Sequence, residues 1–110
     1  MATYSHMTVG DLITFLREQD PHATIRGLSD DAMSYRGYYE HVGIEPGETT
    51  VEALLTELER KVGTTMHGYK GGDFPFEDRC LVFVAYYGST GDKLIGFDEN
   101  LQAVTMEDTW

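Results

Sequence analysis

Two short segments of this chain each pair a tyrosine with a cation and a glycine: Tyr35-Arg36-Gly37 and Tyr69-Lys70-Gly71. Cations are scarce here, because the 110 residues include 8 Lys and Arg against 19 Asp and Glu. An Arg guanidinium grips phosphate or carboxylate through its planar fork, and Lys offers a compact charge to the same groups. Glycine lets the backbone approach a ligand and expose its N–H. The expected chemistry is the binding of a small anion with a flat ring, such as a nucleotide.

The candidate site joins both segments and adds one more ring. Its expected ligand-binding residues are Tyr35, Arg36, Gly37, Tyr38, Tyr69, Lys70 and Gly71. The alternative is two ordinary loops whose tyrosines cover a sheet and whose glycines turn the chain. The run GYKGG is no phosphate-binding P-loop, because it lacks the spacing of that motif and no helix follows it.

The residues that could perform catalysis form no recognisable set. The four histidines, His6, His22, His41 and His67, show no metal-ligand spacing, and a single cysteine cannot supply a thiolate-rich zinc site. Cys80 opens an apolar stretch, where a thiol is usually buried and inert. We therefore expect a binding protein rather than an enzyme, with no cofactor and no metal.

Composition narrows the possible partners. A net charge of −11 and a pI near 4.5 argue against direct nucleic-acid binding, which needs clustered Lys and Arg, and against an anionic membrane surface. The start of the chain resembles no signal peptide, and the longest apolar run, Cys80–Tyr87, is too short to span a bilayer. One cysteine forms no internal disulfide. We expect a cytoplasmic protein whose acidity serves solubility or mimics nucleic acid.

Two helices are predicted to support the candidate site. Thr8-Val-Gly-Asp11 resembles a capping box and opens a helix over Val9–Glu18, which Pro21 ends. Thr49-Thr-Val-Glu52 is a second capping box. Its helix carries one apolar stripe, formed by Val51, Leu54, Leu55, Leu58 and Val62. Gly63 stands where a C-terminal cap belongs.

Strands are predicted from short apolar or alternating runs. They cover Thr24–Leu28, Tyr38–Glu45, Arg79–Tyr87, Lys93–Phe97 and Leu101–Met106, the last two forming a hairpin around Asp98-Glu-Asn100. Ser29–Ser34 is polar and reads as a loop, and Gly63–Pro75 as an irregular stretch in which Met66-His67 pairs at most briefly.

The predicted fold is α+β, a single domain over residues 1–110 with a loose or weakly paired leader at residues 1–7. The two helices pack on one face of a mostly antiparallel four- or five-stranded sheet, in the order α-β-β-α-β-β-β. Aromatic content and an apolar C-terminal hairpin favour a homo-oligomer, with a dimer preferred.

The segments SYRGYYE and GYKGG, with the helix openings at Thr8 and Thr49, also carry a resemblance. From about Met7 to Leu94 the chain resembles a group of small uncharacterised proteins encoded by tailed bacteriophages, especially those of actinobacteria. The resemblance implies an accessory protein made inside an infected bacterium, and a shared site at the two segments. Such proteins often counter bacterial immunity. One way is to sequester a nucleotide signal without chemistry, and another is to dock on a host or defence protein as an acidic inhibitor.

Overall fold

The computed structural model describes residues 6–34, 41–67, 73–84 and 91–107. Their helices are α1 (Val9–Arg17) and α2 (Val51–Lys61). Their strands are β1 (Thr24–Arg26), β2 (Ala32–Ser34), β3 (His41–Ile44), β4 (Glu48–Thr50), β5 (Thr65–His67), β6 (Asp73–Pro75), β7 (Leu81–Val84), β8 (Asp92–Phe97) and β9 (Ala103–Glu107). The fold is α+β, as the sequence predicts.

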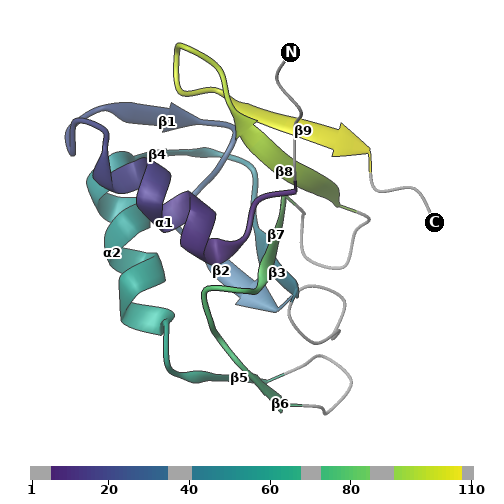
Figure 1. The fold of residues 1–110 in the computed structure, drawn as a ribbon. Helices are drawn as coiled ribbons and strands as arrows, with labels where there is room; N and C mark the ends of the chain where they lie inside the picture. The colour runs from purple at the N-terminus through teal and green to yellow at the C-terminus, as the bar shows by residue number, and fades with distance from the viewer. Residues whose placement is uncertain (1–5, 35–40, 68–72, 85–90, 108–110) are drawn as a thin grey trace.

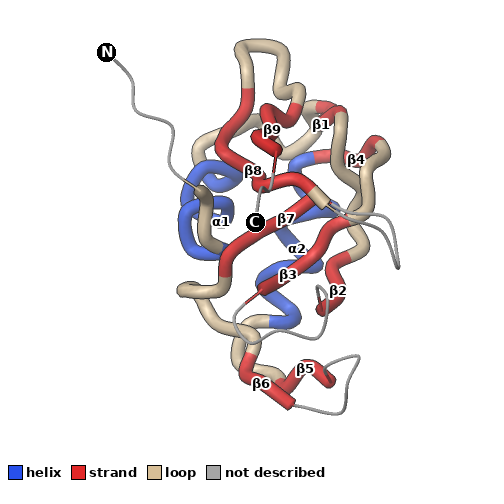
Figure 2. Tube along the Cα trace, turned by 90° about the vertical axis from the view of Figure 1, so that its right-hand side faces the viewer, coloured by secondary structure: helices blue, strands red, loops and turns tan. Residues whose placement is uncertain are grey.

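A five-stranded sheet with the order β2-β3-β7-β8-β9 forms the centre of the molecule. Its neighbours pair antiparallel except β3 and β7, which are parallel. Two small antiparallel ribbons, β1–β4 and β5–β6, flank it. Both helices lie on the same side of the sheet (Figures 1 and 2), which confirms the predicted arrangement. The opposite side is called the helix-free face below.

Helix α1 begins as its sequence predicts. The Thr8 hydroxyl accepts a hydrogen bond from the Asp11 N–H, and the Asp11 carboxylate accepts one from the Thr8 N–H, so the capping box is complete. The helix buries its apolar side, formed by Val9, Leu12, Ile13 and Leu16. No helix in the described part of the chain is long and apolar enough to cross a membrane.

Helix α2 begins one residue later than the predicted capping box. Thr49 pairs with Ile25 and Thr50 with Thr24, so the β1–β4 ribbon continues up to the first residue of the helix. Thr50 caps the helix instead, and its hydroxyl accepts from the Ala53 N–H at 3.1 Å. At the other end Gly63 has a φ of +91°, the left-handed conformation that ends helices, as predicted.

The main core lies between the helices and the sheet. Along β7 the side chains alternate, so that Val82 and Val84 join this core whereas Leu81 and Phe83 form a separate cluster on the helix-free face. The main core includes Ile25, Val42, Ile44, Leu54, Leu58, Val82 and Leu94, all with no exposed surface. Full burial of one such side chain contributes about 1.5–3 kcal/mol.

Several short strands depart from the predictions. Ser29–Ser34 was expected to be a loop, but β2 occupies its second half, because backbone pairing with β3 outweighs the polar Asp30-Asp31. β4 follows the Pro46-Gly47 turn and was not predicted. The brief strand expected at Met66-His67 is confirmed as β5, and its partner β6 makes that stretch a hairpin. The predicted hairpin of β8 and β9 is confirmed.

The backbone of Met7 lies between β7 and β8. The two strands pair directly only at Phe83–Lys93 and Val84–Asp92. Beyond that point the Met7 N–H donates to the Leu94 carbonyl at 2.9 Å, and the Met7 carbonyl accepts from the Val82 N–H at 3.0 Å. Residue 7, part of the expected leader, is therefore a backbone bridge between two strands, whereas residues 1–5 lie outside the described part.

The burial pattern of α2 separates two neighbouring leucines. Leu54 is fully buried, whereas Leu55 is only partly buried against the core. We expect Leu54→Ala to lower the free energy of unfolding by about 2–5 kcal/mol, because it leaves a cavity, and Leu55→Ala to cost clearly less. Urea unfolding of both variants measures the difference. Equal losses, or a larger loss at Leu55, would contradict this orientation of the helix.

Candidate functional site

All seven predicted site residues lie outside the described residues: Tyr35, Arg36, Gly37, Tyr38, Tyr69, Lys70 and Gly71. What the structure does place is the stem of each hairpin. Ser34 pairs with Val42 at the end of β2–β3 that leads into residues 35–40. His67 pairs with Asp73 at the end of β5–β6 that leads into residues 68–72. Each Tyr-cation-Gly segment thus connects two paired antiparallel strands.

The two stems are neighbours. Strand β2 lies beside β5, although a whole helix separates them in the sequence. Both strands run away from the helices, toward the side of the helix-free face (Figure 1). The two connections therefore begin at the ends of neighbouring strands.

Aromatic and basic side chains gather on the helix-free face. The His6 ring meets Phe83 edge-on at 4.6 Å between centroids, and the His41 ring lies 4.9 Å from Phe83 on a tilted plane. The His6 Nε2–H donates to the Val82 carbonyl at 2.7 Å. Lys93 is the cross-strand neighbour of Phe83 and shares its face. This face therefore supplies rings and a cation beside the start of β3.

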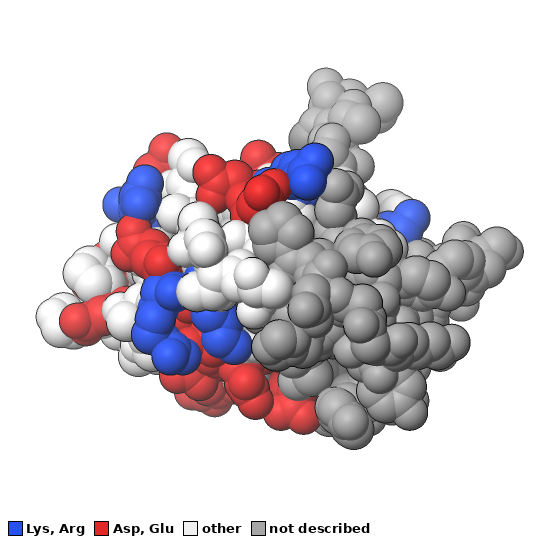
Figure 3. Space-filling model, turned by 90° about the horizontal axis from the view of Figure 1, so that it is seen from below, with Lys and Arg blue, Asp and Glu red and all other residues white. Residues whose placement is uncertain are grey.

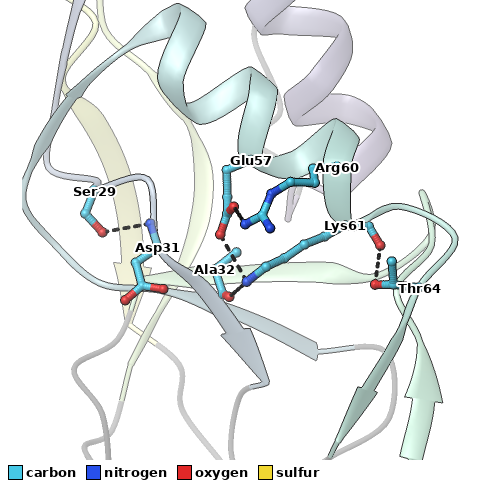
Figure 4. Close-up of polar contacts among 7 residues, drawn as sticks. All are labelled: Ser29, Asp31, Ala32, Glu57, Arg60, Lys61 and Thr64. Carbon is cyan, nitrogen blue, oxygen red and sulfur yellow. Dashed lines mark hydrogen bonds and ion pairs between the residues drawn. The ribbon is translucent and has the colours of Figure 1, made fainter.

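Two side chains of α2, Glu57 and Lys61, contact the outer edge of β2 and are called the clamp below (Figure 4). β2 is an edge strand of the sheet, so its outward backbone groups need partners. The Lys61 ammonium donates to the Ala32 carbonyl and forms an ion pair with Glu57, with 3.0 Å between Nζ and Oε2. Glu57 also pairs with Arg60. The side chains of Glu57 and Lys61 thus link α2 to β2.

The electrostatics of the clamp favour an ionised Glu57. Its side chain is only 12% exposed, and burial alone raises the pKa of a carboxyl group. The hydrogen bonds from Arg60 and Lys61, the charge of Lys61 and a backbone hydrogen bond with Ala32 outweigh that effect. Together they lower the pKa of Glu57 below its usual 4.5.

A shallow groove of about 680 Å³ runs along α1, but its chemistry does not suit an anion. Arg17 in its wall pairs with Glu59 at 2.6 Å, and Arg79 pairs with Glu77 at 2.7 Å. Asp11 and Asp78 add negative charge to the lining. The first N–H groups of α1 already donate to the Cys80 and Asp78 carbonyls and to Thr8.

Metal-ligating and nucleophilic groups are dispersed in the described residues. No three His, Cys, Asp or Glu side chains there lie close enough together to hold a metal ion. Cys80 is fully buried, as expected, and its sulfur accepts a hydrogen bond from the Glu77 N–H at 3.4 Å.

The sequence analysis did not identify Glu57 and Lys61 as site-supporting residues. Their spacing of four residues indicates an ion pair on one side of a helix, and both fall outside the apolar stripe of α2, where a solvated role is the usual interpretation. What sequence could not reveal is the contact with Ala32, which depends on a strand that was expected to be a loop.

Comparison with protein-family models, with curated proteins and with solved structures finds no significant match for this chain. The functional argument therefore rests on the residues and their geometry.

The clamp gives stability a defined pH dependence. Because the pKa of Glu57 is lowered on folding, its contribution is present above about pH 4.5, its usual pKa, and is lost as pH falls below that value. We expect Glu57→Gln to be less stable than the wild type near pH 7. The difference should shrink near about pH 3, where the carboxyl group is protonated.

Urea unfolding across this pH range measures that difference. Glu48→Gln, at an exposed position on β4, is the matched control and should stay within about 0.5 kcal/mol of the wild type. A Glu57→Gln deficit that is constant across the range would refute the linkage.

Proposed function

We propose that this protein is a small phage accessory protein that counters host defence by sequestering an anionic, nucleotide-like small molecule without chemistry. The binding residues in this proposal are Tyr35, Arg36, Gly37, Tyr38, Tyr69, Lys70 and Gly71. The observation that carries it is the neighbourhood of β2 and β5, the strands that lead directly into the two Tyr-cation-Gly segments. Adjacent stems favour one shared site over two separate loops.

The use of the other cations supports the same proposal. Among the described residues, the cations that form ion pairs with carboxylates are Arg17, Arg60, Lys61 and Arg79. A cation held in this way has less attraction left for a ligand. Arg36 and Lys70 lie outside the described residues. Lys93, which has no carboxylate partner among the described residues, offers a positive charge on the helix-free face.

The proposed function requires the protein only to bind its ligand and includes no chemical step. Hydrogen bonds to charged groups contribute about 1.5–3 kcal/mol each, and a stacked ring adds roughly 0.5–1.5 kcal/mol beyond its buried area. Tyrosines beside both cations supply faces for such stacking, and adjacent glycines let the backbone N–H groups approach the anion. A protein that holds its ligand in this way removes it from solution without altering it.

Isothermal titration calorimetry with AMP, GMP, ATP, GTP, cyclic di-AMP and cyclic di-GMP tests the proposal. We expect at least one of them to bind, and Arg36→Ala to weaken its binding at least tenfold while leaving the fold intact, because at least 1.4 kcal/mol of charged hydrogen bonding is lost. Arg36→Lys should also lose affinity, since a point charge does not replace the planar fork.

Arg26→Ala is the matched control, because it removes the same charge from an exposed position on β1. Its affinity should equal that of the wild type. Binding by Arg36→Ala as tight as by the wild type, or no binding of any nucleotide by the wild type, would count against the proposal.

A second candidate is an acidic inhibitor that docks on a host or defence protein, and the net charge of −11 favours it. A nucleic-acid mimic needs a continuous negative surface. In the described part of the face shown in Figure 3, basic side chains lie among the acidic ones, so that part is not continuously negative. If every nucleotide fails to bind, a host protein retained in low salt and released in high salt would favour this candidate.

We also propose a homo-oligomer, most simply a dimer. Met106 is 50% exposed on β9, which is an edge strand of the five-stranded sheet. An apolar side chain on an edge strand is a natural place for a second copy to pair. Light scattering should give twice the 12.4 kDa chain mass at high concentration. A measured mass equal to that of the monomer at every concentration would contradict the proposed dimer.

A further inference from the structure

We propose that Lys61 is a positioning residue, which sets the placement of the β2–β3 hairpin relative to the β5–β6 hairpin and thereby controls ligand affinity. The inference rests on the proposed function, because it takes the two hairpins to share one ligand. Lys61 itself need not touch that ligand. It lies where α2 ends, between the strands that lead into the two Tyr-cation-Gly segments (Figure 4).

The side chain of Lys61 reaches the first hairpin. Its ammonium donates to the backbone carbonyl of Ala32, the first residue of β2, and its side chain is only 23% exposed. The ion pair with Glu57 holds the ammonium in place. Glu57 in turn forms a hydrogen bond with the Ala32 backbone, so the pair substitutes for a neighbouring strand at this edge.

The backbone of Lys61 reaches the second hairpin. Its carbonyl accepts hydrogen bonds from the Thr64 N–H at 2.9 Å and from the Thr64 hydroxyl at 2.6 Å. The Thr64 carbonyl then accepts from the Phe76 N–H at 2.8 Å, directly beyond the end of β6. Lys61 therefore fixes the point at which the chain leaves α2 and enters β5.

Lys61 thus contacts the base of both hairpins. Its neighbour Arg60 offers a comparison, because it shares the ion pair with Glu57 but not the contact with β2. Arg60 pairs with the same Glu57 carboxylate, but its side chain is 68% exposed, and no hydrogen bond or ion pair joins it to β2 within the described residues. Removing either cation costs Glu57 one partner, whereas only Lys61 carries the link to Ala32.

Lys61→Met keeps the length and apolar stem of the side chain and removes the charged donor. We expect amide hydrogen exchange, followed by NMR, to become at least tenfold faster in β2, where the side-chain link to Ala32 is lost, whereas the backbone link to Thr64 remains. Core amides of α2 and β7 should keep their protection. Affinity for the tightest-binding nucleotide of the panel above should fall at least fivefold. Arg60→Met is the matched control and should change neither the exchange in β2 and β5 nor the affinity.

The exchange measurement needs no ligand, so the two proposals fail separately. Unchanged exchange in β2 of Lys61→Met would overturn the positioning role whatever the affinity does. Faster exchange with wild-type affinity would overturn it as well, because the placement would then not matter for binding. Faster exchange in a protein whose wild type binds no nucleotide would support the link between the hairpins and refute the proposed function.

Discussion

The parallel pairing of β3 with β7 is the constraint on which the other elements depend. Two antiparallel strands can be joined by a tight turn, but parallel strands need a crossover of a dozen or more residues. Here the crossover contains β4, α2, β5 and β6. It places α2 over one face of the sheet and must return to the end where β7 begins. Because His41 and Leu81 are register partners, that end is also where β3 begins. The parallel pair therefore brings the β5–β6 ribbon back beside the β2–β3 hairpin.

Two of the cations of this acidic chain, Arg17 and Lys61, join elements that are distant in sequence. Arg17 of α1 pairs with Glu59 of α2, although both side chains are exposed, so the pair contributes at most about 1 kcal/mol. Lys61 joins α2 to β2 in a less exposed setting, where a hydrogen bond to a charged group contributes more. Carboxylates outnumber cations in this chain, so the positions of Arg17 and Lys61 decide which elements are linked. The specificity of these links therefore comes from the position of the cation.

Strong local patterns predicted the long elements, and weak ones did not predict the short strands. The apolar stripes of α1 and α2 and the apolar run of β7 depend on neighbours within a few residues, so the sequence indicated them correctly. β2, β4 and β6 are three residues long and are held by pairing with another strand, which a pattern within three residues does not indicate. Thr49 is a further example, because its capping motif predicted the start of α2 one residue too early, and β4 continues through Thr50. The candidate binding residues were predicted from type and spacing and lie outside the described residues, whereas the clamp of Glu57 and Lys61 depends on a tertiary contact.

The position of Met7 has a consequence for the order in which the molecule is assembled. Its two backbone partners, Val82 and Leu94, are synthesised long after it. Met7 therefore cannot take its native place until the chain has been synthesised as far as Val82 and Leu94. Contacts of such long sequence separation slow folding, because a large loop must close before they form. We therefore expect Met7 to enter the sheet last. Until then the backbone groups of β7 and β8 that Met7 pairs with are open to pairing with other chains.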